Sequence, residues 1–348
     1  MDKYFRHKKT VKKHKKAKRF FWSLFVVMLI VGAFYFVKLF KIITSDNVDT
    51  QGEKEVSVFI KTGSTFEDVK NELYSKNLII NKEHFEFFAE KRKYVDNIKA
   101  GHYILRNGMS NYQLINMLRS GIQTPVKVTF NNIRFVEELA GRVSLMIEPD
   151  SAAIMNALKI KDVSPVIFLP DTYEFFWNIT AEGFVDRMMK EYEIFWDDER
   201  EAQAKRLGLS KEEVSILASI VDKETNLVGE MPDIAGVYVN RLKHGWPLQA
   251  DPTLIFAIKD FDVKRVLDRH KEVESPYNTY KYAGLPPGPI CIPSKAAINA
   301  VLNYKKHNYL YFCAASDCSG RHVFAKTLSE HNRNAEKYHK ALKTKSKH

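Results

Sequence analysis

The sequence predicts an α+β protein with a single N-terminal transmembrane helix, a small α+β module and a larger mixed α/β domain. An unbroken apolar run near the N-terminus, stretches of strand-like alternation among stretches of helical periodicity, and a length of 348 residues lead to this prediction. The predicted boundaries are a basic tail over 1–19, the transmembrane helix over 20–41, a linker over 42–54, the module over 55–122, the larger domain over 123–340 and a basic tail over 341–348.

Most of the positive charge lies at the two ends of the chain. The net charge is +12. Residues 1–19 hold ten Lys or Arg against one Asp, and residues 335–348 hold five Lys against one Glu, which leaves a net charge of −1 on the rest. A nucleic-acid-binding domain carries its positive charge on a folded surface. The charge distribution therefore excludes a basic groove spread over a folded domain, and we expect no nucleic-acid partner.

The apolar run from Phe20 to Val37 predicts a helix that spans the membrane. Its eighteen uncharged residues cover about 27 Å, close to the thickness of the hydrocarbon core. A cleaved signal peptide is the alternative, but the run is long for one and no A-x-A site follows. Ten cations precede the run against Lys38 and Lys41 after it, so the N-terminus is expected in the cytoplasm. We expect a single-pass protein of the inner (plasma) membrane with its body on the periplasmic, extracytoplasmic side.

Cysteine and histidine spacing indicates no metal site. Of the three cysteines, Cys313 and Cys318 flank a short turn, and they either form a small disulfide in an oxidising compartment or remain ordinary thiols. No spacing of Cys and His matches a zinc site, and HExxH does not occur. We expect neither a metal nor a cofactor.

The unit over 55–122 has the pattern strand, helix, helix, strand, helix. The expected elements are a strand over 56–60, a helix capped by Thr65, a helix capped by Asn81, a strand over 99–105, and a helix that starts at Ser110 and ends before Gly121. Strand–helix–helix–strand is the layout of a LysM-like sugar-binding module, and a plain α+β spacer has the same layout.

The larger domain opens on a strand, because Val126, Val128 and Phe130 alternate with polar residues. Helices are expected over 133–147 and 183–207, with a turn over 170–173 between them. The Lys-rich C-terminal end is expected to be a frayed helix.

One carboxylate is expected on a buried helix face. Ser210 and Glu213 form a capping box, and the apolar face of Leu217, Ile220 and Val221 reaches Glu224 at its next position. Asp222 and Lys223 are expected to point to solvent. Burial and the negative end of a helix both raise the pKa of a carboxyl, and a carboxyl protonated near neutral pH suits general-acid cleavage of a glycosidic bond. The alternatives are a buried Glu paired with Arg241, or one just beyond the core.

Polar and aromatic clusters follow Glu224 along the chain. One cluster, at residues 240–242, forms the end of a predicted helix. The others lie in a turn over 248–253 and in rigid loops over 277–280 and 284–290. Aromatic faces beside amide and hydroxyl groups suit a glycan, although each cluster taken alone is more typical of an ordinary turn. The candidate glycan-binding residues are Asn240, Arg241, Gln249, Asp251, Tyr277, Asn278, Thr279 and Tyr280.

In nine segments the sequence resembles the endolytic murein transglycosylases, also called the YceG-like family. The segments are Ala100–Tyr103, Leu169–Tyr173, Leu217–Thr225, Val239–Leu242, Leu248–Thr253, Tyr277–Tyr280, Gly284–Gly288, Tyr309–Phe312 and His331–Asn332. The family's essential Glu follows Lys and precedes a small residue, which corresponds to Glu224. This chain has Asp222 where members often have Glu, and Gly320-Arg-His322 where Gly-Gly-His is usual.

The resemblance implies a LysM-like module followed by a YceG-like catalytic domain. It implies a lytic transglycosylase, a peptidoglycan lyase that cleaves the β-1,4 bond between MurNAc and GlcNAc within a strand and leaves a 1,6-anhydroMurNAc end. Penicillin-binding peptidoglycan synthases are the implied partners. The alternatives are a non-enzymatic peptidoglycan-binding anchor and a membrane-tethered scaffold of the cell-wall synthesis machinery.

Overall fold

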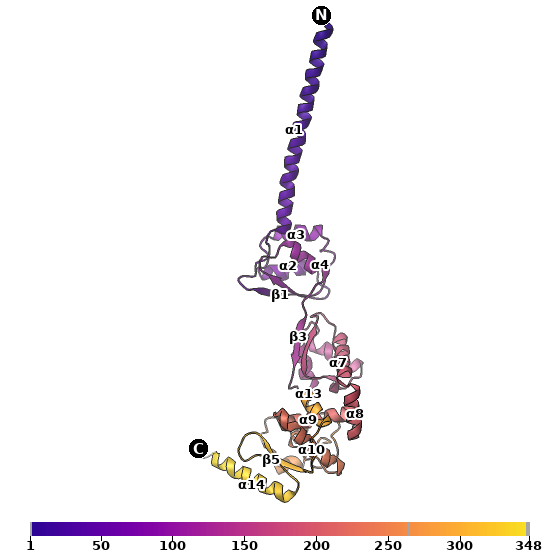
Figure 1. Cartoon of the computed structure of the whole chain (residues 1–348), viewed down its shortest axis with the longest axis vertical. Helices are drawn as coiled ribbons and strands as arrows, with labels where there is room; N and C mark the ends of the chain where they lie inside the picture. The colour runs from indigo at the N-terminus through magenta and orange to yellow at the C-terminus, as the bar shows by residue number, and fades with distance from the viewer. Residues whose placement is uncertain (1, 264, 346–348) are drawn as a thin grey trace. The chain divides into compact units, whose positions relative to one another are not determined.

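The computed structural model describes residues 2–263 and 265–345 (Figure 1). It is a mixed α+β structure, mostly helical, and its described residues hold three two-stranded sheets. The chain divides into two compact units, residues 1–126 with 176–178, and residues 127–175 with 179–348. The α+β class is therefore as predicted.

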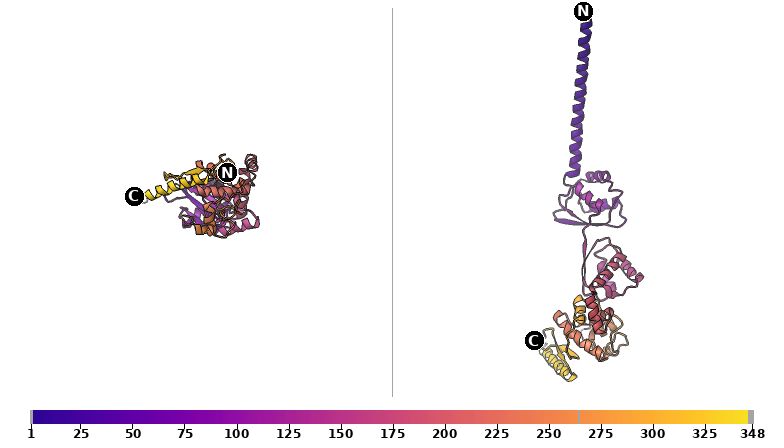
Figure 2. Two further views of the ribbon diagram at one scale, coloured as in Figure 1. Left: turned by 90° about the horizontal axis from the view of Figure 1, so that it is seen from below. Right: turned by 45° about the vertical axis from the view of Figure 1, so that its right-hand side comes forward.

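The first unit begins with helix α1 (Asp2–Thr44), which includes the predicted span. Its segment Lys18–Thr44 contains an 18-residue window of mean hydropathy 2.4 with no part of it buried. Its apolar side chains from Phe20 to Phe40 are exposed, and α1 extends as one long helix away from the rest of the first unit (Figure 2). An exposed apolar helix at this place is typical of a membrane anchor or of a signal sequence.

The rest of the first unit packs three helices against a two-stranded antiparallel sheet. Its elements are β1 (Glu55–Ile60), α2 (Phe66–Ser75), α3 (Lys82–Lys91), β2 (Gly101–Arg106) and α4 (Asn111–Ser120). The predicted N-caps Thr65, Asn81 and Ser110 all accept a hydrogen bond from the backbone of their helix. Gly121 ends α4 with a left-handed φ of 73°. The predicted order of elements is confirmed here.

The stretch predicted as a linker packs into this unit. Asn47 and Val48 are buried, and Val48 lies in the apolar core. The Asn47 side chain donates to Asn111 Oδ1 over 2.7 Å and accepts from the Asn81 backbone N–H over 2.7 Å. Hydrogen bonds to distant residues thus order a segment whose few apolar residues indicated no structure.

The second unit starts with a strand pair and a group of helices. Its elements are β3 (Val126–Phe130), α5 (Val136–Val143), α6 (Ser151–Ile160), η1 (Pro165–Ile167), β4 (Asp171–Phe175), α7 (Ala181–Phe195) and α8 (Asp198–Leu207). The strand at 126 is confirmed, but the turn predicted over 170–173 is wrong because β4 pairs there with β3. The helix predicted over 183–207 is two helices, since Asp197 caps a new one. Helix α5 is shorter than predicted, and α6 was not predicted.

The remainder of the second unit surrounds a helical core. Its elements are α9 (Lys211–Glu224), η2 (Val228–Glu230), α10 (Met231–Lys243), α11 (Asp251–Ile258), α12 (Asp268–Lys271), α13 (Lys295–Leu302), β5 (Tyr311–Ala314), β6 (His322–Ala325) and α14 (Leu328–Lys345). Helices α9, α10 and α13 contribute most of the buried apolar cluster. The turn predicted over 248–253 is partly wrong, because Asp251 is the first residue of α11.

Candidate active site

Helix α9 delivers Glu224 as the sequence pattern predicts. Ser210 Oγ accepts from the Glu213 backbone N–H over 3.1 Å, and the Glu213 carboxylate accepts from the Ser210 N–H over 2.7 Å. The face of Leu217, Ile220 and Val221 is fully buried. Glu224 is the last residue of the helix and leaves this face where the core opens into a pocket.

The pocket has a volume of about 370 Å³ and draws its walls from several elements. Its lining residues are Glu224, Arg241, Gln249, Asp251, Tyr280, Tyr311, Phe312, Leu328 and His331. Four of the predicted glycan-binding residues thus meet Glu224: Arg241, Gln249, Asp251 and Tyr280. Aromatic, amide and charged groups together suit a polar ligand that also has apolar faces, such as a sugar.

The Glu224 carboxyl has a raised affinity for its proton. Its pKa is raised from an ordinary value near 4.5 to about 7, chiefly by burial and to a smaller extent by the nearby Asp251 carboxylate. The Tyr238 hydroxyl donates to Glu224 Oε1 over 2.5 Å and lowers the pKa, as does the positive charge of Arg241. Burial is the largest of these effects, so the group exchanges its proton near neutral pH.

Arg241 is held by backbone carbonyls and makes no ion pair with Glu224 among the described residues. Its Nε donates to the Leu310 carbonyl over 2.8 Å and its Nη1 to the Leu248 carbonyl over 2.5 Å. Its guanidinium lies 5.5 Å from the centre of the Tyr311 ring. The alternative of a buried Glu224–Arg241 pair is therefore not what the structure contains.

Asp251 and Gln249 reach the pocket from one short segment. The Tyr280 hydroxyl donates to Asp251 Oδ1 over 2.5 Å. Gln249 has a left-handed φ of 49° and donates its backbone N–H to the Thr279 carbonyl over 2.9 Å. A non-glycine residue in this conformation is uncommon and is held in place by its surroundings, which here present the side chain to the pocket.

Thr279 and Asn278 are not among the residues that line the pocket. Both are buried. Thr279 Oγ1 accepts from the Ala250 backbone N–H over 3.0 Å, and the Asn278 amide donates to the carbonyls of Lys271 and Val273. They shape the loop that carries Tyr280.

The structure does not bring Asn240 or Tyr277 to the pocket either. The Asn240 amide donates to the carbonyls of His307 and Tyr309 over 2.8 and 3.0 Å. Tyr277 packs on Phe256 with ring centres 4.7 Å apart. Both side chains therefore stabilise loops. Composition alone does not distinguish this structural role from sugar binding.

Five residues at the pocket or next to it were not among the predicted site residues. They are Tyr238, Tyr311, Phe312, Leu328 and His331. Tyr238 was visible as a core position three residues before Arg241 on α10, and Tyr311, Phe312 and His331 lie in segments that carry the family resemblance. The sequence contained signals for these four but none for Leu328.

The sequence predicts that Asp222 and Lys223 point to solvent, but both side chains are half-buried. Asp222 Oδ1 accepts from the hydroxyl of Ser294, the N-cap of α13, over 2.6 Å. Lys223 donates to Asn132 Oδ1 over 2.8 Å. Neither lines the Glu224 pocket.

No group of three or more His, Cys, Asp or Glu side chains within the described residues is arranged to hold a metal ion. Cys291, Cys313 and Cys318 are free thiols in the structure.

The sequence profile of the YceG-like family matches residues 58–337. The chain belongs to the YceG-like family. It is 30% identical over 338 residues to the endolytic murein transglycosylase of Bacillus subtilis, a match that covers 89% of this chain and 91% of that protein. It is 27% identical over 365 residues to the endolytic murein transglycosylase of Streptococcus pneumoniae, covering 92% of this chain and 65% of that one.

A solved structure also resembles this YceG-like chain. The crystal structure of a protein of Listeria monocytogenes described as YceG-like shares 27% sequence identity with a TM-score of 0.52. The match covers 80% of this chain and 98% of that one.

The segment in which this YceG-like chain departs from the usual Gly-Gly-His is tied to the end of α9. His322 donates its backbone N–H to Glu230 Oε1 over 2.7 Å, and its Nδ1 lies 2.7 Å from Glu230 Oε2. The Thr225 hydroxyl donates to the same carboxylate over 3.4 Å. Because Thr225 follows Glu224 directly, these bonds connect the β5–β6 hairpin to the backbone that positions Glu224.

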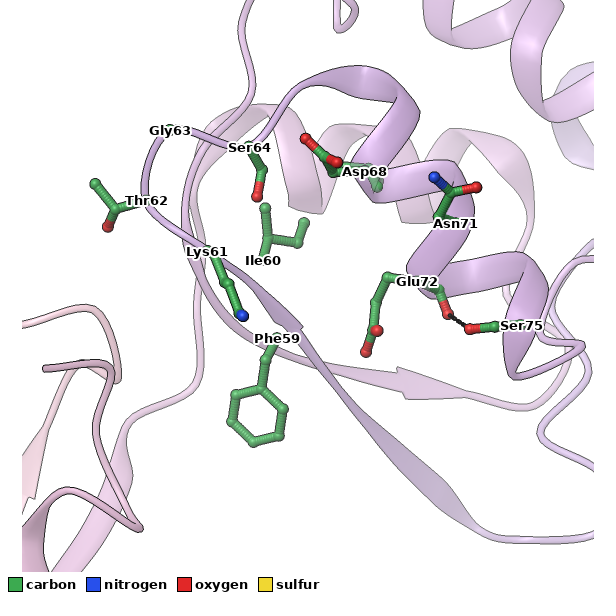
Figure 3. Close-up of a pocket in the computed structure, with 11 residues that line it drawn as sticks. Phe59, Ile60, Lys61, Thr62, Gly63, Ser64, Asp68, Asn71, Glu72 and Ser75 are labelled. Atoms are coloured by element: carbon green, nitrogen blue, oxygen red, sulfur yellow. Dashed lines mark hydrogen bonds between the residues drawn. The ribbon is translucent and has the colours of Figure 1, made fainter. Parts of the chain in front are cut away.

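A second pocket of about 570 Å³ lies in the first unit, between the end of β1 and α2 (Figure 3). Phe59, Lys61, Ser64, Asn71 and Glu72 are among its lining residues. The Phe59 ring is stacked on His102 with centres 4.7 Å apart. The lining combines polar side chains with one aromatic residue, a composition that is again suited to a sugar.

Proposed function

We propose that this YceG-like chain is a membrane-anchored endolytic murein transglycosylase. It cleaves the β-1,4 bond between MurNAc and GlcNAc within peptidoglycan strands, leaves a 1,6-anhydroMurNAc end, and so terminates the elongation of nascent strands. The observation that carries the proposal is the position of Glu224, a carboxyl with a pKa of about 7 in a pocket with aromatic walls. Membership of a family whose named relatives are endolytic murein transglycosylases supports it.

In the proposed reaction Glu224 transfers both protons. The protonated carboxyl gives its proton to the glycosidic oxygen, and the bond from C1 to that oxygen breaks. The resulting carboxylate takes the proton of the MurNAc 6-hydroxyl, whose oxygen forms the new bond to C1, and Glu224 returns to its protonated state. A single carboxyl is sufficient, unlike in ordinary glycosidases, which use two. A pKa near the working pH suits a group that acts first as acid and then as base.

The other lining residues hold the strand. Tyr280 and Tyr311 present aromatic rings on which the apolar faces of sugars stack, and Gln249 and Asp251 bind hydroxyl groups. The Asp251 carboxylate also favours the protonated form of Glu224. Arg241 shapes the wall through its bonds to the Leu248 and Leu310 carbonyls.

The product distinguishes this reaction from hydrolysis. The full chain in detergent is incubated with purified glycan strands, and the fragments are analysed by mass spectrometry. Intramolecular attack gives muramic ends lighter by one water than those of a hydrolase. Hydrolytic ends alone would contradict the lytic mechanism, and intact strands would contradict the enzymatic function.

Substitution of Tyr238 by Phe is expected to move the pH dependence of the reaction. In the wild type the hydrogen bond from Tyr238 lowers the pKa of Glu224. Without this bond the pKa rises, and the alkaline limb of the kcat/KM profile moves to higher pH by about one unit. The measurement is a rate profile between pH 5 and pH 9. Tyr304→Phe is the control, because that hydroxyl accepts from Lys243 outside the pocket; equal profiles for both variants would contradict the role of Tyr238.

The proposed setting is the outer face of the plasma membrane. Helix α1 anchors the chain with its basic N-terminus in the cytoplasm, because positive charge is retained on that side. The body then meets peptidoglycan strands, and penicillin-binding synthases are its proposed partners.

A second candidate function is glycan binding by the first unit without catalysis, as in an anchor or scaffold. The pocket beside α2 favours it. In a full chain made inactive by Glu224→Gln, Asn71→Ala is expected to weaken co-sedimentation with sacculi about threefold, the effect of losing one hydrogen bond. Glu90→Ala, on the exposed side of α3, is the control. Unchanged sedimentation of the Asn71 variant would argue against sugar binding in this pocket.

A further inference from the structure

The last helix supplies one wall of the Glu224 pocket. The Thr327 hydroxyl accepts from the Glu330 backbone N–H over 3.3 Å, and the Glu330 carboxylate accepts from the Lys326 N–H over 2.9 Å. These bonds fix the start of α14. Leu328 and His331 are three residues apart, so they share a helix face, and both line the pocket. The start of α14 is therefore ordered at the point where it meets the site.

The imidazole of His331 has no hydrogen-bond partner among the described residues. Its Nδ1 is buried and unpaired. The ring lies against Tyr311 with centres 5.5 Å apart. No hydrogen bond to the described residues fixes the orientation of the ring. Buried polar groups in proteins are nearly always paired. A ligand bound in the pocket can supply the partner that the imidazole of His331 lacks.

The surroundings decide which kind of partner fits. Burial and the positive charge of Arg241 both lower the pKa of His331, so the ring is neutral near neutral pH. A neutral imidazole has one donor and one acceptor and suits hydroxyl or amide groups better than an anion. Leu328 on the same face is an apolar side chain that lines the pocket and is 55% exposed.

We propose that His331 is a glycan-binding residue, whose imidazole exchanges a hydrogen bond with a hydroxyl or acetamido group of a hexosamine in the Glu224 pocket while Leu328 covers the apolar face of that sugar. The inference rests on the proposed function in taking a glycan as the ligand. It assigns His331 to binding and assigns it no proton transfer.

Binding is measured with the full chain in detergent, carrying Glu224→Gln so that labelled glycan strands remain intact. We expect His331→Ala to raise the Kd about five- to tenfold, the effect of one lost hydrogen bond. His331→Gln, which keeps a donor and an acceptor within reach, is expected to recover most of the affinity. His339→Ala is the matched control, because His339 is exposed on the same helix outside the pocket.

The active background adds a test that a structural role would not pass. With Glu224 intact, His331→Ala is expected to raise KM by a similar factor and to change kcat by less than about threefold. A Kd unchanged by His331→Ala would overturn the inference, as would equal weakening in the Ala and Gln variants together with a lower Tm. If the wild type yields no anhydro ends, the proposed reaction is wrong while the Kd series still decides the role of His331.

Discussion

Replacement of Glu224 by Gln is expected to reduce kcat for release of anhydro-muropeptides by about a thousandfold or more, with glycan binding retained. General acid–base catalysis contributes about 10²- to 10⁴-fold, and here one group performs both transfers, so the loss lies toward the upper end. Gln keeps the shape of the side chain and an oxygen that accepts from Tyr238, but it has no proton to give. The measurement is mass spectrometry of digested sacculi, with glycan binding assayed on the same preparation.

Asp222→Asn is the matched control for this prediction. It removes a carboxylate two residues earlier on the same helix, keeps an oxygen for the Ser294 hydroxyl, and lies outside the pocket. We expect its kcat to stay within about threefold of the wild type, as for a substitution away from the reacting atoms. Normal product from the Glu224 variant, or an equal loss in both variants, would contradict the assignment of Glu224.

The sequence was sufficient wherever a local chemical signal determines the structure. Ser110 and Ser210 have side chains that bond the first turn of their own helix, so both helix starts were predictable and are confirmed. The periodicity of α9 likewise placed Glu224 on its buried face. These features depend on residues within one or two helical turns of each other.

The errors have non-local causes. Strand β4 was interpreted as a turn because it follows Pro170 and exists only by pairing with β3, far earlier in the chain. Asn240 and Asn278 were placed in the cleft by their polarity, although their amides pair with backbone carbonyls of distant loops. His331 reaches the pocket on the last helix, so no spacing in the sequence could show that it lies near Glu224.

The same substitution of Glu224 by Gln is expected to stabilise the fold above neutral pH. A carboxyl whose pKa is about 7 when folded and near 4.5 when unfolded is protonated only in the native state between those values. The unfolded state then binds fewer protons, so the free energy of unfolding falls with rising pH at about 1.4 kcal/mol per unit. Below pH 4.5 the ionisation of Glu224 does not destabilise the fold. Above pH 7 this ionisation penalty reaches its full size and lowers the free energy of unfolding by about 3 kcal/mol.

Gln cannot ionise and escapes this penalty. We therefore expect Glu224→Gln to unfold with a free energy about 2–3 kcal/mol higher than the wild type at pH 8.5, and with nearly the same free energy at pH 4. Denaturant titrations at the two pH values measure the difference, and Glu174→Gln, an exposed carboxyl on β4, provides the control. A difference independent of pH would show that Glu224 ionises as an ordinary carboxyl. The catalytic proposal would then lose its physical basis, because the burial that costs stability is the same burial that keeps the acid protonated.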